Sequence, residues 1–500
     1  MERIGHYINN EIAINEKNRS APVYNPASGE QIAEVELGAE SEVESAVSAA
    51  ADAFQSWSKT PPVVRAKVLF RFRDLIESHR DDLAQSITTQ HGKVLSDAQG
   101  EITRGLEVVE FACGIPHAQK GEFSLNVGRE VDSFSLMQPL GVCVGITPFN
   151  FPVMVPMWMF PIALACGNTF VLKPSEKDPS PSLKIAELLL EAGLPEGVFN
   201  VVNGDKQAVD LLLQHKTVQA VSFVGSTPIA EYIYSESSRN GKRCQALGGA
   251  KNHLVVMPDA ETSEVVNALT GSAFGSAGER CMAVSVAVCV GDKTGDRIVE
   301  SLKTASESLR IGPGSSTENE PDLGPLITGD HKRKVKSYIE SGVEQGAKLV
   351  LDGREAEAAK SSSGFFIGPT IFDFVKPSMD IYLDEIFGPV LSVVRVDSLA
   401  DAIGLINDHQ FGNGTSIFTN DGGNARVFQE EIKVGMVGVN IPIPVPMAYH
   451  SFGGWKNSIF GPLNMHGPDG VRFFTRMKTI TSRWSEAQAG RPNFSIPTSE

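Results

Sequence analysis

The sequence predicts an α/β protein that contains parallel sheets and more than one domain. Its 500 residues exceed what a single hydrophobic core usually accommodates. In the middle of the chain, short apolar runs alternate with amphipathic stretches, and glycine or proline residues separate them. This alternation is typical of a doubly wound sheet, in which helices connect parallel strands.

The first alternating block begins at Gly141. The expected strands are 141–146, 170–172, 199–202 and 220–224. Helices are expected around 183–190, with Gly193 at the helix end, and at 207–214. Gly225-Ser226-Thr227 follows the last of these strands and opens a further helix. This order of strands and helices predicts parallel strand pairing.

A second alternating block begins near Leu254. Its expected elements are a strand at 254–256, a helix at about 262–277, a strand at 284–290 and a helix at about 294–309. Residues 312–325 are rich in glycine, proline and serine and are expected to form a loop. The tail 471–484 alternates with a period of two, so we expect it to add a strand at an interface.

Composition and charge exclude several classes of protein. The 44 basic and 60 acidic residues give a net charge of −16, whereas a nucleic-acid binder usually presents a net basic face. The uncharged stretch 137–172 contains five prolines, which would break a continuous membrane-spanning helix. The six cysteines are scattered without a CxxC pair, and the first twenty residues contain no apolar signal segment. We therefore expect a cytoplasmic protein without a metal site.

Gly-Glu-Arg-Cys at 278–281 is the most specific chemical feature. A thiol between a glycine-flanked turn and an apolar strand can act as an exposed nucleophile. The alternative is a buried cysteine that serves as a small apolar side chain. The other five cysteines lie in or beside apolar runs and fit that alternative. From the residues alone, Cys281 stays open between the two interpretations.

Three polar motifs follow expected strand ends, where open α/β sheets bind their ligands. Asn150, in Pro-Phe-Asn-Phe-Pro, could donate to an oxyanion or cap the following helix. Lys173 and Glu176, in Lys-Pro-Ser-Glu-Lys, could bond ribose hydroxyls or belong to a solvated charged loop. Ser226 stands at a helix start suited to a pyrophosphate, although no phosphate-loop motif surrounds it.

Three charged residues remain ambiguous from their spacing. Arg280 and Arg104 could each grip a carboxylate with two donors. Arg104 could equally pair with Glu101, three residues earlier on an expected helix. Glu385, in Asp-Glu-Ile-Phe-Gly-Pro, precedes the expected strand 390–396 and is either a ligand contact or a turn charge.

The ordered set of motifs resembles the NAD(P)-dependent aldehyde dehydrogenase superfamily. The matching motifs are Pro-Phe-Asn-Phe-Pro, Lys-Pro-Ser-Glu, Phe-Val-Gly-Ser-Thr, Gly-x-x-Cys and Glu-Ile-Phe-Gly-Pro. The resemblance implies an aldehyde dehydrogenase-like α/β fold and a homo-oligomer, a tetramer in preference to a dimer. It implies a Rossmann-like NAD-binding domain at 1–122 and 142–250, a catalytic domain at 251–440, and an oligomerisation arm and tail at 123–141 and 471–500.

The resemblance also implies roles for individual residues. Cys281 would be the nucleophile and Asn150 the oxyanion donor. Glu176 would favour NAD over NADP, because its carboxylate would repel a 2′-phosphate. Lys173 and Glu176 would hold the adenine-side ribose, Ser226 would lie near the pyrophosphate, and Glu385 would hold the nicotinamide ribose. The full set expected around NAD is Thr147, Phe149, Lys173, Glu176, Lys177, Ser226, Gly248 and Glu385.

One departure from the family pattern changes the expected reaction. Hydrolytic members carry Glu-Leu-Gly-Gly-Lys, whose glutamate activates water, whereas this chain has Gln-Ala-Leu-Gly-Gly-Ala-Lys at 245–251. The position of the glutamate falls on Ala246 or Leu247, and neither residue can act as a base. A thioacyl enzyme would then need another acceptor, such as the thiol of coenzyme A.

The segments 249–253 and 256–260 resemble the CoA-acylating methylmalonate-semialdehyde branch of that family. In this branch, Arg104 and Arg280 would clamp the carboxylate of a 3-oxo acid. We therefore expect NAD-dependent oxidation and decarboxylation of methylmalonate or malonate semialdehyde to propionyl-CoA or acetyl-CoA, in valine or inositol catabolism. The alternatives are a hydrolytic aldehyde dehydrogenase that forms a free acid and a catalytically silent relative.

Overall fold

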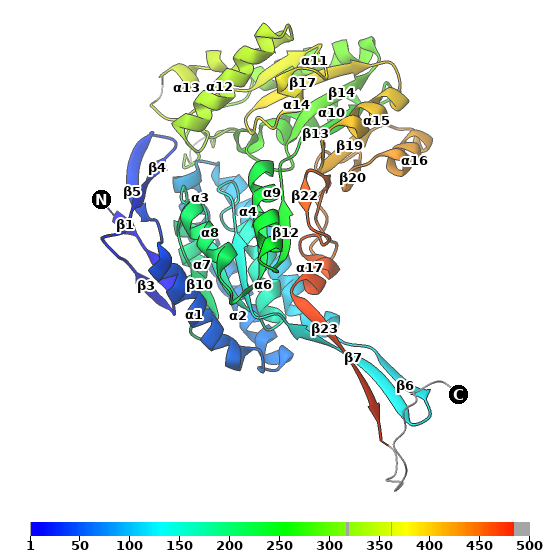
Figure 1. Cartoon of the computed structure of the whole chain (residues 1–500). Coiled ribbons are helices and arrows are strands. Elements are labelled where there is room, and N and C mark those ends of the chain that lie inside the picture. Colours follow the sequence, from blue (N-terminus) through cyan, green and yellow to red (C-terminus); the bar gives the residue numbers. More distant parts are fainter. Residues whose placement is uncertain (1, 317–319, 362, 485–500) are drawn as a thin grey trace.

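The computed structural model describes residues 2–316, 320–361 and 363–484. Two sheets with their helices form the body of the molecule, and a narrow arm projects from it (Figure 1). The mixed α/β architecture with parallel sheets confirms the predicted fold class.

The first sheet has eight strands in the order β22-β12-β11-β8-β9-β10-β2-β3. Its five central strands pair in parallel, and short strands at both edges pair antiparallel. Each predicted strand of this block overlaps an observed one, with ends that differ by at most two residues. The observed bounds are β8 (Val142–Ile146), β9 (Thr169–Lys173), β10 (Phe199–Val201), β11 (Val218–Val224), β12 (Arg243–Leu247), β22 (Ile459–Phe460), β2 (His6–Ile8) and β3 (Glu11–Ala13).

Helices cover both faces of the first sheet, and each face has its own hydrophobic cluster. One face carries α2 (Pro62–Ser78), α3 (Arg80–His91), α4 (Leu95–Cys113), α5 (Ile115–Ala118), α6 (Met154–Ala165) and α7 (Ser180–Glu191). The other carries α1 (Glu40–Trp57), α8 (Lys206–Gln214) and α9 (Thr227–Arg239).

Helix α6 explains the uncharged stretch in the sequence. All of its residues are buried, Pro161 included, because the helix packs against the sheet on one side and against α2 and α4 on the other. None of the helices in the described ranges combines the length and apolarity that a membrane crossing requires.

The second sheet has seven strands in the order β15-β16-β17-β14-β13-β19-β20, parallel except for the β15–β16 pair. Its strands are β13 (Asn252–Val256), β14 (Val284–Val290), β15 (Lys348–Leu351), β16 (Thr370–Asp373), β17 (Val390–Val396), β19 (Gly414–Phe418) and β20 (Met436–Val439). The main helices around it are α10 (Thr262–Phe274), α11 (Asp292–Glu307), α12 (Gly329–Glu344), α15 (Leu399–Asp408) and α16 (Gly422–Glu431). Shorter elements are α13 (Glu357–Ser361), α14 (Asp380–Leu383), β18 (Phe411–Gly412) and β21 (Trp455–Lys456).

The helix predicted at 262–277 is too long, because the regular α-helix ends at Phe274. A short turn at Gly275–Gly278 follows, in which Ser276 and Ala277 adopt left-handed backbone conformations with φ of 52° and 51°. Gly278 has φ of 75°, and a Cβ added there would lie 2.3 Å from the carbonyl oxygen of Gly388. The turn therefore requires glycine at 278, and it sets the direction in which the chain reaches residue 281.

The arm is a three-stranded antiparallel sheet of β6 (Phe123–Gly128), β7 (Val131–Pro139) and β23 (Thr475–Arg483) (Figure 1). The tail strand begins at Thr475, four residues later than predicted, because Gly467–Phe473 form helix α17. The rest of the predicted tail, 485–500, lies outside the described residues. Phe123, Leu125 and Met477 project from the arm with more than 60% of their side-chain surface exposed.

The two sheets follow the predicted division of the chain near residue 250, but the domain limits themselves stay a prediction. Strand β22 comes from the segment 441–470, which the prediction had left unassigned, and it pairs with β12 at the edge of the first sheet. The chain therefore returns to the first sheet after it has completed the second.

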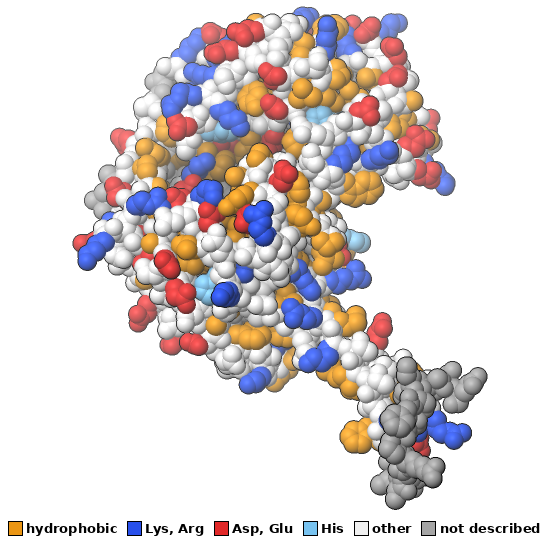
Figure 2. Space-filling model, viewed as in Figure 1, with side chains coloured by type: hydrophobic (Ala, Val, Ile, Leu, Met, Phe, Trp, Pro, Cys, Tyr) orange, Lys and Arg blue, Asp and Glu red, His pale blue; other side chains and the backbone are white. Residues whose placement is uncertain are grey.

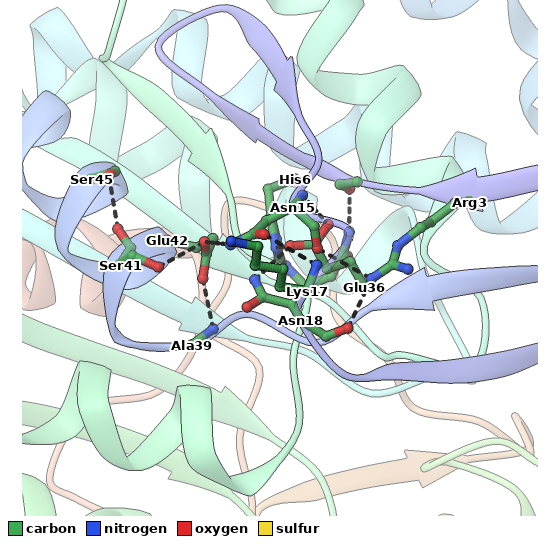
Figure 3. A network of polar contacts seen from close by, with 12 residues as sticks. Arg3, His6, Asn15, Lys17, Asn18, Glu36, Ala39, Ser41, Glu42 and Ser45 are labelled. Atoms are coloured by element: carbon green, nitrogen blue, oxygen red, sulfur yellow. Dashed lines mark hydrogen bonds and ion pairs between the residues drawn. The ribbon is translucent and has the colours of Figure 1, made fainter.

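A polar network fixes the N-terminal strands β1 (Glu2–Ile4), β4 (Ser20–Asn25) and β5 (Glu30–Glu36) near the edge of the first sheet (Figure 3). The buried Glu36 carboxylate accepts hydrogen bonds from the Asn15 backbone N–H at 2.8 Å and the Asn18 amide at 2.7 Å. The Nε2 atom of His6 lies 3.2 Å from the same carboxylate, and both side chains are fully buried. Burial lowers the pKa of His6, although Glu36 opposes the shift.

Candidate active site

A cavity of about 760 Å³ lies where the carboxyl ends of β8, β9 and β11 face the second sheet, in the hollow visible in the space-filling view (Figure 2). Its size and position are those of ligand sites in open α/β sheets. The predicted residues that line it are Cys281, Asn150, Thr147, Phe149, Lys173, Glu176, Lys177, Ser226, Gly248 and Glu385.

Cys281 reaches the cavity directly after the left-handed turn at 275–278. Its backbone carbonyl accepts hydrogen bonds from the side-chain amides of Asn252 at 2.9 Å and Asn413 at 3.2 Å. The residue is only partly buried, whereas the other five cysteines are buried. Burial of the Cys281 thiol, together with the nearby Glu385 carboxyl, raises its pKa to about 12. The thiol is therefore neutral at rest and must lose its proton when it attacks.

Asn150 lies at the turn between β8 and α6, and only 3% of its surface is exposed. It does not cap α6: the N-cap position is Val153, and Glu101 accepts hydrogen bonds from the backbone N–H groups of Val153 at 2.8 Å and Met154 at 3.1 Å. The helix-cap interpretation of Asn150 is thus wrong. Its side-chain amide is therefore available to donate to a ligand in the cavity that it lines.

The charged motif after β9 is not a solvated loop. Lys173 is 6% exposed, and its ammonium lies 3.3 Å from the Glu176 carboxylate. Burial opposes ionisation of Glu176, but the charges of Lys173 and Lys177 and the hydrogen bonds to the carboxylate together outweigh it, so the pKa of Glu176 lies below its usual value. The Lys177 ammonium lies 4.6 Å from the centre of the Phe149 ring. Together these groups present one carboxylate and two ammonium groups to one end of the cavity.

Ser226 is the N-cap residue of α9, and its side chain makes no capping hydrogen bond. The neighbouring Thr227 hydroxyl instead accepts a hydrogen bond from the Gly249 backbone N–H at 2.8 Å. Ser226 and Ile229, at the start of this 13-residue helix, line the cavity together with Gly248. The positive end of the helix dipole suits an anionic group there.

Glu385 approaches the cavity from the side of the second sheet, between α14 and β17. Its carboxylate accepts a hydrogen bond from the Ala250 backbone N–H at 2.9 Å, and burial raises its pKa to about 7. A Cβ on Gly249 would lie 2.5 Å from this carboxylate, so a side chain at 249 would displace the Glu385 carboxylate. Glu385 and Cys281 also line a narrow recess beside Arg280.

Neither arginine lines the main cavity, and both are ion-paired. Arg280 lines the narrow recess beside Cys281, whereas Arg104 lines a separate small pocket. Arg104 does not pair with Glu101, as one interpretation of the sequence held. It binds Glu107 at 2.7 Å and the backbone carbonyl of Pro446 at 2.9 Å. Arg280 binds Asp97 at 2.6 Å. Because Asp97 and Arg104 stand seven residues apart on α4, they share one face of that helix.

The sequence reasoning missed several residues that support this site. Asn252 lies within a motif singled out above, but nothing in the sequence placed it on the Cys281 carbonyl. Asn413 lies in an ordinary loop. Lys93 and Glu101 form a buried ion pair at 2.8 Å beneath Asn150, and no local pattern around them indicates it. Such contacts join residues far apart in the chain.

The structure also shows what stands where hydrolytic family members carry their water-activating glutamate. Ala246 and Leu247 lie in β12, both buried. Neither of them lines the cavity with Cys281. Whichever alignment is used, no carboxylate stands at that position.

Comparisons with known proteins agree with this geometry. The model of the aldehyde dehydrogenase family matches residues 13–480. Malonate-semialdehyde dehydrogenase of Pseudomonas aeruginosa is 57% identical over the full length of both chains, and malonate-semialdehyde dehydrogenase 2 of Geobacillus kaustophilus is 49% identical over 97% of this chain and 99% of its own.

Two solved structures are similar over nearly the whole chain. The crystal structure of methylmalonate-semialdehyde dehydrogenase from Oceanimonas doudoroffii has a TM-score of 0.95 and 57% identity, and a protein from Sinorhizobium meliloti in complex with NAD has a TM-score of 0.96 and 52% identity. Each alignment covers 97% of this chain and 99% of the other. The match of the family model, together with these relatives, shows that the chain belongs to the aldehyde dehydrogenase family.

Proposed function

We propose that this enzyme oxidises malonate or methylmalonate semialdehyde with NAD, releases carbon dioxide and transfers the acyl group to coenzyme A. The observation that carries the proposal is the combination of Cys281 and Asn150 in one cavity with buried Ala246 and Leu247 where a water-activating glutamate would stand. The names of the relatives, malonate- and methylmalonate-semialdehyde dehydrogenase, support the substrate.

The residues of the cavity fit NAD. A volume of about 760 Å³ with apolar walls and polar ends suits a dinucleotide. We assign Lys173 and Glu176 to a ribose and Ser226, at the start of α9, to the pyrophosphate. The similar protein from Sinorhizobium meliloti was solved with NAD. The Glu176 carboxylate would repel a 2′-phosphate, which favours NAD over NADP. When bound, NAD accepts the hydride from the aldehyde carbon.

Cys281 is the proposed nucleophile. Its sulfur forms a bond to the aldehyde carbon and gives up its proton, and the carbonyl oxygen becomes an oxyanion. The side-chain amide of Asn150 and the backbone N–H of Cys281 donate to that oxyanion. Removal of one such donor typically lowers the rate by about 10²–10³. After oxidation, the acyl group remains on Cys281 as a thioester.

The free carboxylate of the substrate makes decarboxylation feasible. When the carbon–carbon bond to the carboxylate breaks, its electron pair moves toward the thioester carbonyl, and the resulting enolate takes up a proton. The thiol of coenzyme A then attacks the thioester and releases Cys281. Malonate semialdehyde would give acetyl-CoA, and methylmalonate semialdehyde would give propionyl-CoA, within valine catabolism for the methylated substrate. Without a general base, water competes poorly as the acceptor.

We further propose a cytoplasmic homo-oligomer, a tetramer in preference to a dimer. The six free cysteines support a reducing compartment. The exposed apolar side chains of the arm, Phe123, Leu125 and Met477, support burial of the arm against another subunit.

The decisive experiment measures NADH formation from malonate and methylmalonate semialdehyde with NAD, with and without coenzyme A. Sustained turnover only with coenzyme A, and acetyl-CoA or propionyl-CoA as product, would support the proposal. Equal turnover without coenzyme A would identify a hydrolytic enzyme. The control variant Cys281→Ala should form no NADH under any condition, and NADH formation by that variant would exclude Cys281 as the nucleophile.

A further inference from the structure

A buried ion pair lies directly beneath the turn that carries Asn150. The Lys93 ammonium is 2.8 Å from the Glu101 carboxylate. Lys93 is 1% exposed and Glu101 is 2% exposed, so the charges of both side chains are removed from water. A buried ion pair gives little net stability compared with apolar side chains of similar volume. Its presence at this place therefore calls for a reason beyond stability.

The pair holds both ends of the turn between β8 and α6. At the first end, the Lys93 ammonium donates a hydrogen bond of 2.6 Å to the backbone carbonyl of Asn150. At the other end, Glu101 accepts hydrogen bonds from the backbone N–H groups of Val153 and Met154. The same ammonium lies 4.3 Å from the centre of the Phe151 ring, between the two ends. One ion pair thus fixes the turn at three points.

The side chain of Asn150 has no comparable support of its own. Across the described ranges of the chain, its amide makes no hydrogen bond to another protein group. The direction of the amide must then come from the backbone of the turn and from packing. The carbonyl that Lys93 binds belongs to Asn150 itself, so the lysine contact constrains the peptide plane next to the amide-bearing side chain.

We propose that Lys93, held by Glu101, is a positioning residue that aims the Asn150 amide at the oxyanion. The inference rests on the proposed function of Asn150. Lys93 does not line the cavity, and it acts on the reaction through the turn that carries Asn150, chiefly through the Asn150 carbonyl. A displacement of about 1 Å in such a donor can cost about 10² in rate.

The charges around the pair decide which variant tests this role. Asp178 is fully buried nearby, and burial, reinforced by the Glu101 carboxylate, raises its pKa well above the usual range. Loss of Lys93 alone would leave Glu101 as an uncompensated buried charge, which strongly destabilises a protein. The double variant Lys93→Met/Glu101→Gln removes both charges at similar volume and keeps an amide oxygen to accept from Val153 and Met154.

The test is a double-mutant cycle against Asn150→Ala. In the wild-type background, Lys93→Met/Glu101→Gln should slow the first turnover of NADH formation by roughly 10- to 100-fold and leave NAD affinity unchanged. In the Asn150→Ala background, the same change should cost less than about threefold, because the group it positions is already absent. Equal losses in the two backgrounds, or no loss in the first, would overturn the proposal.

A second buried lysine provides the matched control. Lys242 donates to the backbone carbonyls of His215 and Val218 at the amino-terminal ends of β11 and β12, and it does not line the cavity. Lys242→Met should lower the unfolding midpoint and leave the NADH rate and its dependence on Asn150 unchanged. A rate loss in Lys242→Met as large as that in Lys93→Met/Glu101→Gln would show that the effect is one of general stability.

Two readouts separate this proposal from the proposed function. The cycle is measured with propanal as well as malonate semialdehyde, so that a failure of the carboxylated substrate leaves the positioning test intact. Crystal structures of wild-type enzyme and Lys93→Met/Glu101→Gln decide the matter without any activity. A rotated or displaced Asn150 amide in the variant would support the inference, and an unchanged Asn150 would overturn it.

Discussion

At the scale of single residues, the site combines the neutral thiol of Cys281 with the side-chain amide of Asn150, whose backbone carbonyl is bound by the buried Lys93. Burial keeps the proton on Cys281, and the Glu385 carboxyl adds to that effect. A protein that needs a thiolate only during attack gains from this arrangement, because a neutral thiol reacts slowly with stray electrophiles. The reactivity of Cys281 then depends on how bound substrate and cofactor change the pKa of its thiol.

We predict that iodoacetamide inactivates the cofactor-free enzyme slowly at pH 7 and about tenfold faster for each pH unit up to pH 9. The thiolate fraction rises tenfold per unit while the pH stays below the pKa of Cys281, about 12. Glu385→Gln should speed inactivation, because it removes the negative charge near the sulfur. The rate is measured as loss of NADH formation, with mass spectrometry to identify the labelled cysteine. A plateau below pH 8 would contradict the high pKa.

At the scale of elements, helix α4 holds several side chains that support the proposed site. Asp97, Glu101 and Arg104 stand four and three residues apart, so they project from one face of the helix. Asp97 holds Arg280, and Glu101 holds Lys93. Arg104 lies one turn further on and is bound to Glu107 and the Pro446 carbonyl. A single helix thus supports Asn150 and Arg280, and it carries Arg104, which could donate hydrogen bonds to a substrate carboxylate.

We predict that Arg104→Leu raises the KM for malonate semialdehyde by about 10- to 100-fold and leaves the KM for propanal unchanged. A hydrogen bond between charged groups contributes about 1.5–3 kcal/mol. Propanal has no carboxylate and cannot form this bond, so the substitution should not affect its binding. The control Arg73→Leu removes a surface arginine that pairs with Glu110. An equal rise in KM for both aldehydes would show that Arg104 shapes the site and does not bind the carboxylate.

The elements also show what a sequence can and cannot predict. Strand β17 was predicted with both of its bounds correct, 390 and 396, since its apolar run lies between a proline and an aspartate. The end of α10 was missed because Ser276 and Ala277 carry no signal for left-handed conformations. The start of β23 was missed because the residues of α17 continue the apolar pattern of the strand.

The candidate site divides in the same way. Cys281, Asn150, Lys173 and Glu176 stand in motifs, and the cavity brings them together. Lys93 could not be placed, because its partner Asn150 is 57 residues away and the contact uses a backbone carbonyl, which any residue possesses. The Glu107 partner of Arg104 was missed because Glu101 and Glu107 are both three residues from Arg104, and only the packing of α4 distinguishes them.

At the scale of the whole molecule, buried histidines set the response to acid. Burial lowers the pKa of six of the ten histidines, namely His6, His91, His253, His331, His409 and His466. These side chains stay neutral in the folded protein and gain protons on unfolding below about pH 6.5. Three buried carboxyls with raised pKa values act in the opposite direction, because they hold protons in the folded protein and release them on unfolding. They are those of Asp178, Glu279 and Glu385.

We predict that the free energy of unfolding decreases between pH 7 and pH 5. Below about pH 6.5 the unfolded chain binds more protons than the folded one, because six histidines then outweigh three carboxyls. Each net proton changes the stability by about 1.4 kcal/mol per pH unit. Urea denaturation followed by circular dichroism at pH 7, 6 and 5 measures the slope. Equal or greater stability at pH 5 would contradict the assignment of neutral buried histidines.

The return of the chain to its first sheet has a consequence for biosynthesis. Strand β22 pairs with β12 across more than 200 residues, and β23 pairs with β7 across more than 330. A ribosome that has completed the entire second sheet still holds the segment that closes the first sheet and the strand that completes the arm. Contacts of this sequence separation form late and slowly. The newly made chain can therefore complete its first sheet and its arm only after translation has reached β23, which couples the folding of these parts to the synthesis of nearly the whole chain.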